Sequence, residues 1–110
     1  MNWIKLESPD QLSTIIDQSH TSPQVIFKHS TRCSISSMAK SRLERSKAPE
    51  NIHFHYLDLI KYRRISNQVA SDFKVYHESP QVLVIQNGEC IYDESHSGIE
   101  MDEIAQFSKN

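Results

Sequence analysis

Residues 25–36 read VIFKHSTRCSIS, and this stretch decides the fold. It begins with the continuous apolar run Val25–Phe27, which is typical of a strand buried on both faces. A short polar turn and then Cys33 follow, and a helical pattern runs from Ser34 to about Arg45. A strand that passes through a cysteine directly into a helix places one thiol at a helix N-terminus.

The setting of Cys33 favours a reactive thiol. The first N–H groups of a helix have no intrahelical acceptor, and the helix dipole adds a partial positive charge at that end. Lys28, His29 and Arg32 add cationic or ionisable groups on the approach to the cysteine. Because helix N-termini and nearby cations favour the thiolate form, we expect Cys33 to be nucleophilic.

Length and composition predict one domain, residues 1–110, with its own hydrophobic core. The formal charge of −2 gives no reason to expect a nucleic-acid partner. No apolar stretch approaches the roughly 18 residues of a membrane span, and the N-terminus lacks a leader pattern, so we expect a cytoplasmic protein without membrane contact. Cys33 and Cys90 are too few and too far apart for a disulfide framework, and Cys90, inside an apolar strand, is predicted to fill the core.

Hydrophobic periodicity predicts the other elements. The predicted strands are residues 3–6, 52–58, 81–85 and 90–93, and the predicted helices begin near Ser8-Pro9 and cover residues 34–45, 61–73 and 100–107. Ser8 is the expected N-cap of the first helix. In the second helix, Ile35, Met38, Ala39 and Leu43 recur at helical spacing and predict the face that packs on the sheet. Asn87-Gly88 predicts a two-residue hairpin turn.

The order β-α-β-α-β-α-β-β-α, with a cysteine at the start of the second helix and a proline before the hairpin, resembles the thioredoxin fold. The resemblance implies an α/β domain with a central mixed sheet of four to five strands, flanked by helices on both faces. It also implies that the Ser79–Pro80 peptide bond is cis and lies beside the cysteine, since a cis X–Pro bond is uncommon enough to mark a functional position.

Four segments, residues 27–36, 64–67, 77–81 and 87–96, resemble the YtxJ-like family of monothiol bacilliredoxins. Members of this family remove bacillithiol from S-bacillithiolated proteins. The resemblance implies that Cys33 is the catalytic nucleophile, supported by Arg32, Ser34, Ser36, Ser79 and Pro80. Ser36 stands at the position of the resolving cysteine of dithiol relatives.

The same resemblance implies the partners of the reaction. No cofactor is bound; bacillithiol is a thiol co-substrate, S-bacillithiolated proteins are the substrates, and bacillithiol or a dithiol protein is the reductant. Because bacillithiol carries carboxylates on its malyl end, Lys28, Arg32 and Arg64 are candidates for a cationic substrate-binding rim, with ordinary solvated charges as the alternative. Two residues depart from the family pattern, Ser34 in place of proline and Ser97 in place of an aromatic residue.

Other interpretations remain open at this level. The domain could be a thioredoxin-like adaptor whose cysteine site is vestigial, or it could carry the arsenate-reductase or peroxidase chemistry found on the same fold. His53 and His55 would project from one face of a strand, but no further ligand pattern completes a metal site, so we expect none. His96 is either a proton donor to Cys33 or an exposed loop residue.

Overall fold

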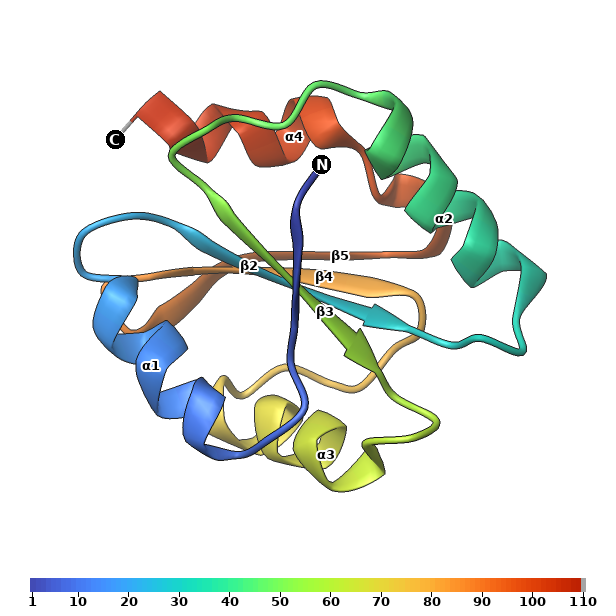
Figure 1. Cartoon of the computed structure of the whole chain (residues 1–110), viewed down its shortest axis with the longest axis horizontal. Helices are drawn as coiled ribbons and strands as arrows, with labels where there is room; N and C mark the ends of the chain where they lie inside the picture. Colours follow the sequence, from blue (N-terminus) through green and yellow to red (C-terminus); the bar gives the residue numbers. More distant parts are fainter. Residues whose placement is uncertain (110) are drawn as a thin grey trace.

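The computed structural model describes residues 1–109 and contains one five-stranded mixed sheet with helices on both faces (Figure 1). The strands are β1 (Trp3–Lys5), β2 (Gln24–His29), β3 (His53–Asp58), β4 (Gln81–Gln86) and β5 (Glu89–Ser95). The helices are α1 (Asp10–Gln18), α2 (Ser34–Arg45), α3 (Arg63–Asp72) and α4 (Met101–Ala105), with 3-10 turns at His96–Gly98 and Gln106–Lys109.

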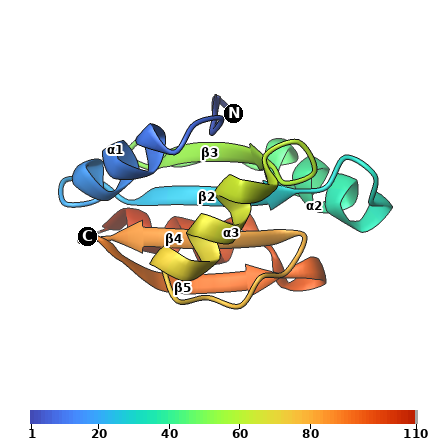
Figure 2. The ribbon, with the colours of Figure 1, turned by 90° about the horizontal axis from the view of Figure 1, so that it is seen from below.

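The strand order is β1-β3-β2-β4-β5. Strands β1, β3 and β2 are parallel, as expected from the helical crossovers between them, whereas β4 runs antiparallel to both β2 and β5. Figure 2 shows this order from the side that α1 and α3 cover. The predicted α/β mixed sheet is confirmed.

Two apolar clusters, one on each face, hold the helices to the sheet. Alternate residues of β2 divide between them: Val25 and Phe27 pack under α2 and α4, while Ile26 packs under α1 and α3. All three are wholly buried. The continuous apolar run of β2 is explained by this burial on both faces, since each successive side chain has a helix to pack against.

The turn at Asn87-Gly88 joins β4 to β5 as predicted. Both residues have positive φ angles, 54° and 80° respectively, which is the backbone conformation that a two-residue turn of this kind requires. The Ser79–Pro80 bond that precedes β4 is cis, also as predicted.

The face that α2 presents to the sheet differs from the prediction. Ala39 and Leu43 are buried, but Ile35 and Met38 are 52% and 62% exposed, and the third buried residue is Ser36. The hydrophobicity pattern predicted the wrong buried face for the first turn of α2. Ser36 can be buried there because its hydroxyl forms hydrogen bonds inside the fold. A hydrophobicity pattern does not recognise a serine satisfied in this way.

The start of α1 differs in detail. Pro9 precedes the first helical residue, and the Ser8 side chain does not cap the helix. Instead the Gln11 side-chain oxygen accepts hydrogen bonds from the backbone N–H groups of Glu7, at 2.7 Å, and Ser8, at 2.9 Å. Only the glutamine half of the expected reciprocal cap is therefore formed. In residues 1–109 no helix is long and apolar enough to cross a membrane.

Candidate active site

Cys33 is the N-cap residue of α2 and is partly exposed. Its carbonyl oxygen accepts the first helical hydrogen bond, from the Ser37 N–H at 3.1 Å, while its own N–H donates to the Ser30 carbonyl at 3.2 Å. The Cys33 side chain does not hydrogen-bond the helix it precedes. The sequence prediction of a thiol at this helix N-terminus is confirmed.

Ser36 joins the first turn of α2 to the end of β2. Its hydroxyl oxygen accepts the Ser30 backbone N–H at 3.0 Å and lies 2.6 Å from His29 Nδ1. Ser36 is wholly buried, and burial is also the main cause that lowers the pKa of His29, so the imidazole is neutral at pH 7. The hydroxyl and the ring nitrogen therefore share one hydrogen bond, and the His29 tautomer determines which of the two donates.

The His29 ring is fixed by its neighbours as well as by Ser36. It stacks on Phe27, with ring centroids 5.8 Å apart, and packs against Tyr56 at 5.5 Å. These contacts hold the C-terminal end of β2 against α2. The residue three positions after Cys33 thus supplies a buried hydroxyl that serves as a structural link.

Lys28 lies on the opposite face of β2 and corrects one prediction. Its side chain is wholly buried, so it forms no part of an exposed cationic rim. Its ammonium donates to the Ser66 carbonyl at 3.2 Å and to His77 Nδ1 at 3.3 Å. Burial lowers the pKa of Lys28 from its ordinary value near 10.5 to about 8, and burial followed by the nearby Lys28 charge lowers the pKa of His77.

Lys28 therefore supports the loop that carries the cis proline. His77 belongs to that loop, and Lys28 pairs across the sheet with Gln81, the residue after Pro80. Continued by one residue, this register places Pro80 opposite His29, at the strand end from which the chain leads to Cys33. The Ser79 hydroxyl oxygen is buried and has no hydrogen-bond partner among the described residues.

His96 links the cis-proline loop to α2. Its backbone N–H donates to the Pro80 carbonyl at 3.0 Å, and its ring nitrogen Nε2 lies 3.6 Å from the Glu78 carboxylate. Its carbonyl accepts a hydrogen bond from Arg42 of α2 at 3.2 Å. The half-exposed His96 ring thus faces Glu78, a contact that the sequence pattern did not identify.

Four further residues that the sequence singled out are exposed and do not all gather at one place: Arg32, Ser34, Arg64 and Ser97. Arg32 and Ser34 flank Cys33 on the surface, whereas Arg64 lies on α3, which covers the other face of the sheet. Ser97, in the turn after β5, is also exposed.

His53 and His55 both contact the side-chain amide of buried Gln24, at 3.0 and 2.7 Å. No group of three metal-ligating side chains occurs in residues 1–109.

Cys90 lies far from Cys33. It pairs with Ile85 on β4, and Ile85 pairs with Gln24 at the start of β2. The five steps from Gln24 to His29 span about 16 Å, and Cys33 follows beyond that end. A disulfide needs α-carbons closer than about 7 Å, so the two cysteines cannot be bridged in this fold. Burial raises the pKa of the Cys90 thiol to about 11, which makes it a poor nucleophile.

One known protein family has a model that matches most of this chain. The family model of the monothiol bacilliredoxin BrxC matches residues 4–104. The chain belongs to this family. It is also 30% identical to a structure described as a proposed oxidoreductase with a thioredoxin fold, with 98% of this chain and 94% of that chain covered and a TM-score of 0.80.

Thioredoxins show the same fold at lower identity. The Malassezia sympodialis thioredoxin is 18% identical, with 98% of this bacilliredoxin-family chain and 91% of the thioredoxin covered and a TM-score of 0.77. Mitochondrial thioredoxin 3 from Saccharomyces cerevisiae is 17% identical, with 96% and 92% covered and a TM-score of 0.72. The family and the fold together support a thiol–disulfide oxidoreductase role.

Removing the Ser36 hydroxyl tests its structural link. We expect Ser36→Ala to lower the free energy of unfolding by about 2 kcal/mol, because it leaves the buried Ser30 N–H without an acceptor. Ser37→Ala, on the exposed side of the same turn, should cost less than about 0.5 kcal/mol. Urea unfolding of both variants measures the difference, and equal losses would contradict the assignment.

Removing the buried charge of Lys28 tests the second link. Because the pKa of Lys28 is lower in the folded chain, the unfolded chain binds more protons between pH 8 and 10.5. The buried charge of Lys28 therefore lowers the free energy of unfolding below pH 8. This destabilisation disappears as the pH rises from 8 to 10.5. Allowing for the two lost hydrogen bonds, Lys28→Met should be about 1 kcal/mol more stable than wild type at pH 7 and about 2 kcal/mol less stable near pH 10.5. Lys47→Met, at an exposed loop position, is the control. A Lys28→Met protein that is less stable than wild type at pH 7 would refute this account.

Proposed function

We propose that this protein removes bacillithiol from S-bacillithiolated proteins through Cys33. The observation that carries the proposal is the partly exposed Cys33 thiol at the N-terminus of α2, in a chain of the monothiol bacilliredoxin family. The second thiol, Cys90, lies at the other end of the sheet and is unreactive. Arg32 and Ser34 flank the nucleophile and contribute to substrate contact, and the reaction takes place in the cytoplasm.

The reaction is a thiol–disulfide exchange. The Cys33 thiolate attacks the bacillithiol sulfur of the mixed disulfide, a new bond forms between that sulfur and Cys33 Sγ, and the substrate cysteine leaves as a thiolate. Bacillithiol is now carried on Cys33, and the substrate protein is reduced. The N–H groups in the first turn of α2 face this end of the helix and stabilise the negative charge as it moves between sulfur atoms.

A second thiol must complete the cycle. Ser36 cannot form a disulfide, and its hydroxyl is already bound to Ser30 and His29. An external thiolate, from bacillithiol or a dithiol protein, therefore attacks the carried bacillithiol sulfur and releases Cys33 as a thiolate. No metal or bound cofactor enters the exchange.

The cis-proline loop receives the substrate protein in this proposal. An extended substrate segment next to its modified cysteine pairs with the Ser79 backbone, in the manner of a strand added to a sheet edge. The hydrogen bonds from Lys28 to His77 and from His96 to Pro80 hold that loop in place beside α2.

Bacillithiol transfer tests the proposed nucleophile. Reduced wild type, Cys33→Ser and Cys90→Ser are each mixed with an S-bacillithiolated model protein, and intact mass is recorded for both proteins. We expect one bacillithiol on wild type and on Cys90→Ser, and at least a hundredfold slower loss from the substrate with Cys33→Ser, because only Cys33 supplies a thiolate.

Two results would contradict the proposal. Transfer by Cys33→Ser at the wild-type rate would show that another group is the nucleophile. Absence of transfer by wild type, together with binding of the substrate protein, would favour an adaptor with a vestigial cysteine site.

A further inference from the structure

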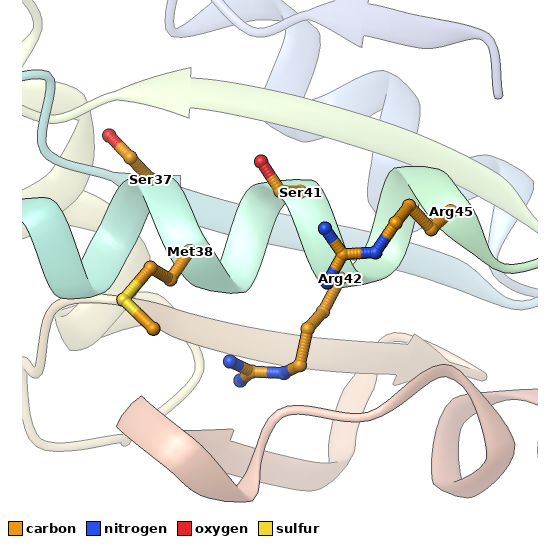
Figure 3. A pocket seen from close by; sticks show the side chains of 5 residues that line it. All are labelled: Ser37, Met38, Ser41, Arg42 and Arg45. Carbon is orange, nitrogen blue, oxygen red and sulfur yellow. The ribbon is translucent and has the colours of Figure 1, made fainter.

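A hollow of 370 Å³ lies along the exposed side of α2, just beyond Cys33. Figure 3 shows the side chains that line it, Ser37, Met38, Ser41, Arg42 and Arg45. Counted from Cys33, residues 37, 41 and 45 follow at intervals of four, so they lie along one edge of the helix. The hollow therefore begins one helical turn after Cys33 in the chain.

Arg42 is held rigidly at this hollow. Its Nε donates to the Ile99 carbonyl at 3.3 Å, and its Nη2 donates to the carbonyls of Ile99 and His96, at 3.1 and 3.2 Å. These bonds leave Nη1 as the guanidinium nitrogen open to a ligand. A fixed guanidinium loses little conformational entropy when it binds an anion, and Nη1 can donate to one carboxylate oxygen.

The positive charge of this surface comes from two arginines of α2. Among the described residues, neither Arg42 nor Arg45 forms an ion pair, and the α2 carboxylate of Glu44 is bound by Lys40 at 2.8 Å. The two arginines also line an adjoining hollow, together with the acidic residues Glu100 and Asp102. The side nearer Cys33 presents two guanidinium groups and two serine hydroxyls.

We propose that this hollow holds the dicarboxylate end of the bacillithiol carried on Cys33, an inference that rests on the proposed function. The sulfur is bonded to Cys33, the sugar lies over the hydroxyls of Ser37 and Ser41, and the malate carboxylates meet Arg42 and Arg45. The ligand class is a thiol that bears a sugar and two carboxylates. The site makes the exchange selective for that thiol over small uncharged ones.

The distances along the helix fit such a ligand. Arg42 follows Cys33 by nine residues, which is about 13 Å at the rise of an α-helix. From the sulfur to the malate carboxylates, bacillithiol has about ten bonds and an extended length of roughly 12 Å. Helical side chains lean toward the N-terminus. Figure 3 shows the guanidinium groups of Arg42 and Arg45 displaced in this way, toward the end of the helix that carries Ser37.

The test compares two disulfides that react with the same thiol. Oxidised bacillithiol carries the sugar and carboxylates, whereas 2-hydroxyethyl disulfide carries neither, and each leaves a mixed disulfide on Cys33 and releases one thiolate. Second-order rate constants are measured for wild type, Arg45→Ala, Arg42→Lys and Arg63→Ala in the Cys90→Ser background. Arg42→Lys keeps a cation in place, and Arg63→Ala removes an exposed arginine of α3 on the other face.

We expect the ratio of the two rate constants, bacillithiol over hydroxyethyl, to fall about tenfold in Arg45→Ala and severalfold in Arg42→Lys, with no change in Arg63→Ala. Removing the nearby acids, in Glu100→Gln with Asp102→Asn, should raise the ratio. Ratios that stay at the wild-type value in both α2 variants would overturn the proposed subsite.

This experiment separates the two proposals. A wild-type protein that reacts selectively with oxidised bacillithiol but takes none from a modified protein would retain the subsite and refute the proposed function. A protein that removes bacillithiol from substrates, with ratios unaffected by the arginine variants, would retain the function and refute the subsite.

Discussion

The hydrogen bond from the Ser30 backbone N–H to the Ser36 hydroxyl is the constraint on which the site depends. It ties the end of β2 to the first turn of α2, and the chain between these two residues has only five residues in which to turn. Cys33 is thereby held at the N-cap of the helix, next to backbone N–H groups that have no acceptor within the helix. The short 2.6 Å contact with His29 fixes the same hydroxyl from the side of the core.

A monothiol site follows from the same link. The residue one turn after the nucleophile is wholly buried and its oxygen is bound on two sides, so it supplies structure and no redox equivalent. On the opposite face of β2, Lys28 is also wholly buried and supports the cis-proline loop through His77. One strand thus positions both the nucleophile and the loop beside it, through side chains on its two faces.

The sequence predicted much of this arrangement. The apolar run of β2, the turn at Asn87-Gly88 and the place of Cys33 follow from local patterns, and the cis bond before Pro80 followed from resemblance to a known fold. The exposure of Ile35 and Met38 did not follow, because a helical hydrophobicity pattern assigns serine to the solvent face, whereas Ser36 is buried. The burial of Lys28 was missed for a similar reason, since its acceptors lie 38 and 49 residues away.

The central claim is that Cys33 works as a single thiol, and the product of oxidation tests it most directly. Wild type is treated with oxidised bacillithiol, and intact mass and peptide mapping locate the modification. The account predicts one stable bacillithiol on Cys33 with Cys90 left as a free thiol. Loss of the adduct with a mass decrease of about two hydrogens, which marks a disulfide between the two cysteines, or an adduct on Cys90, would contradict it.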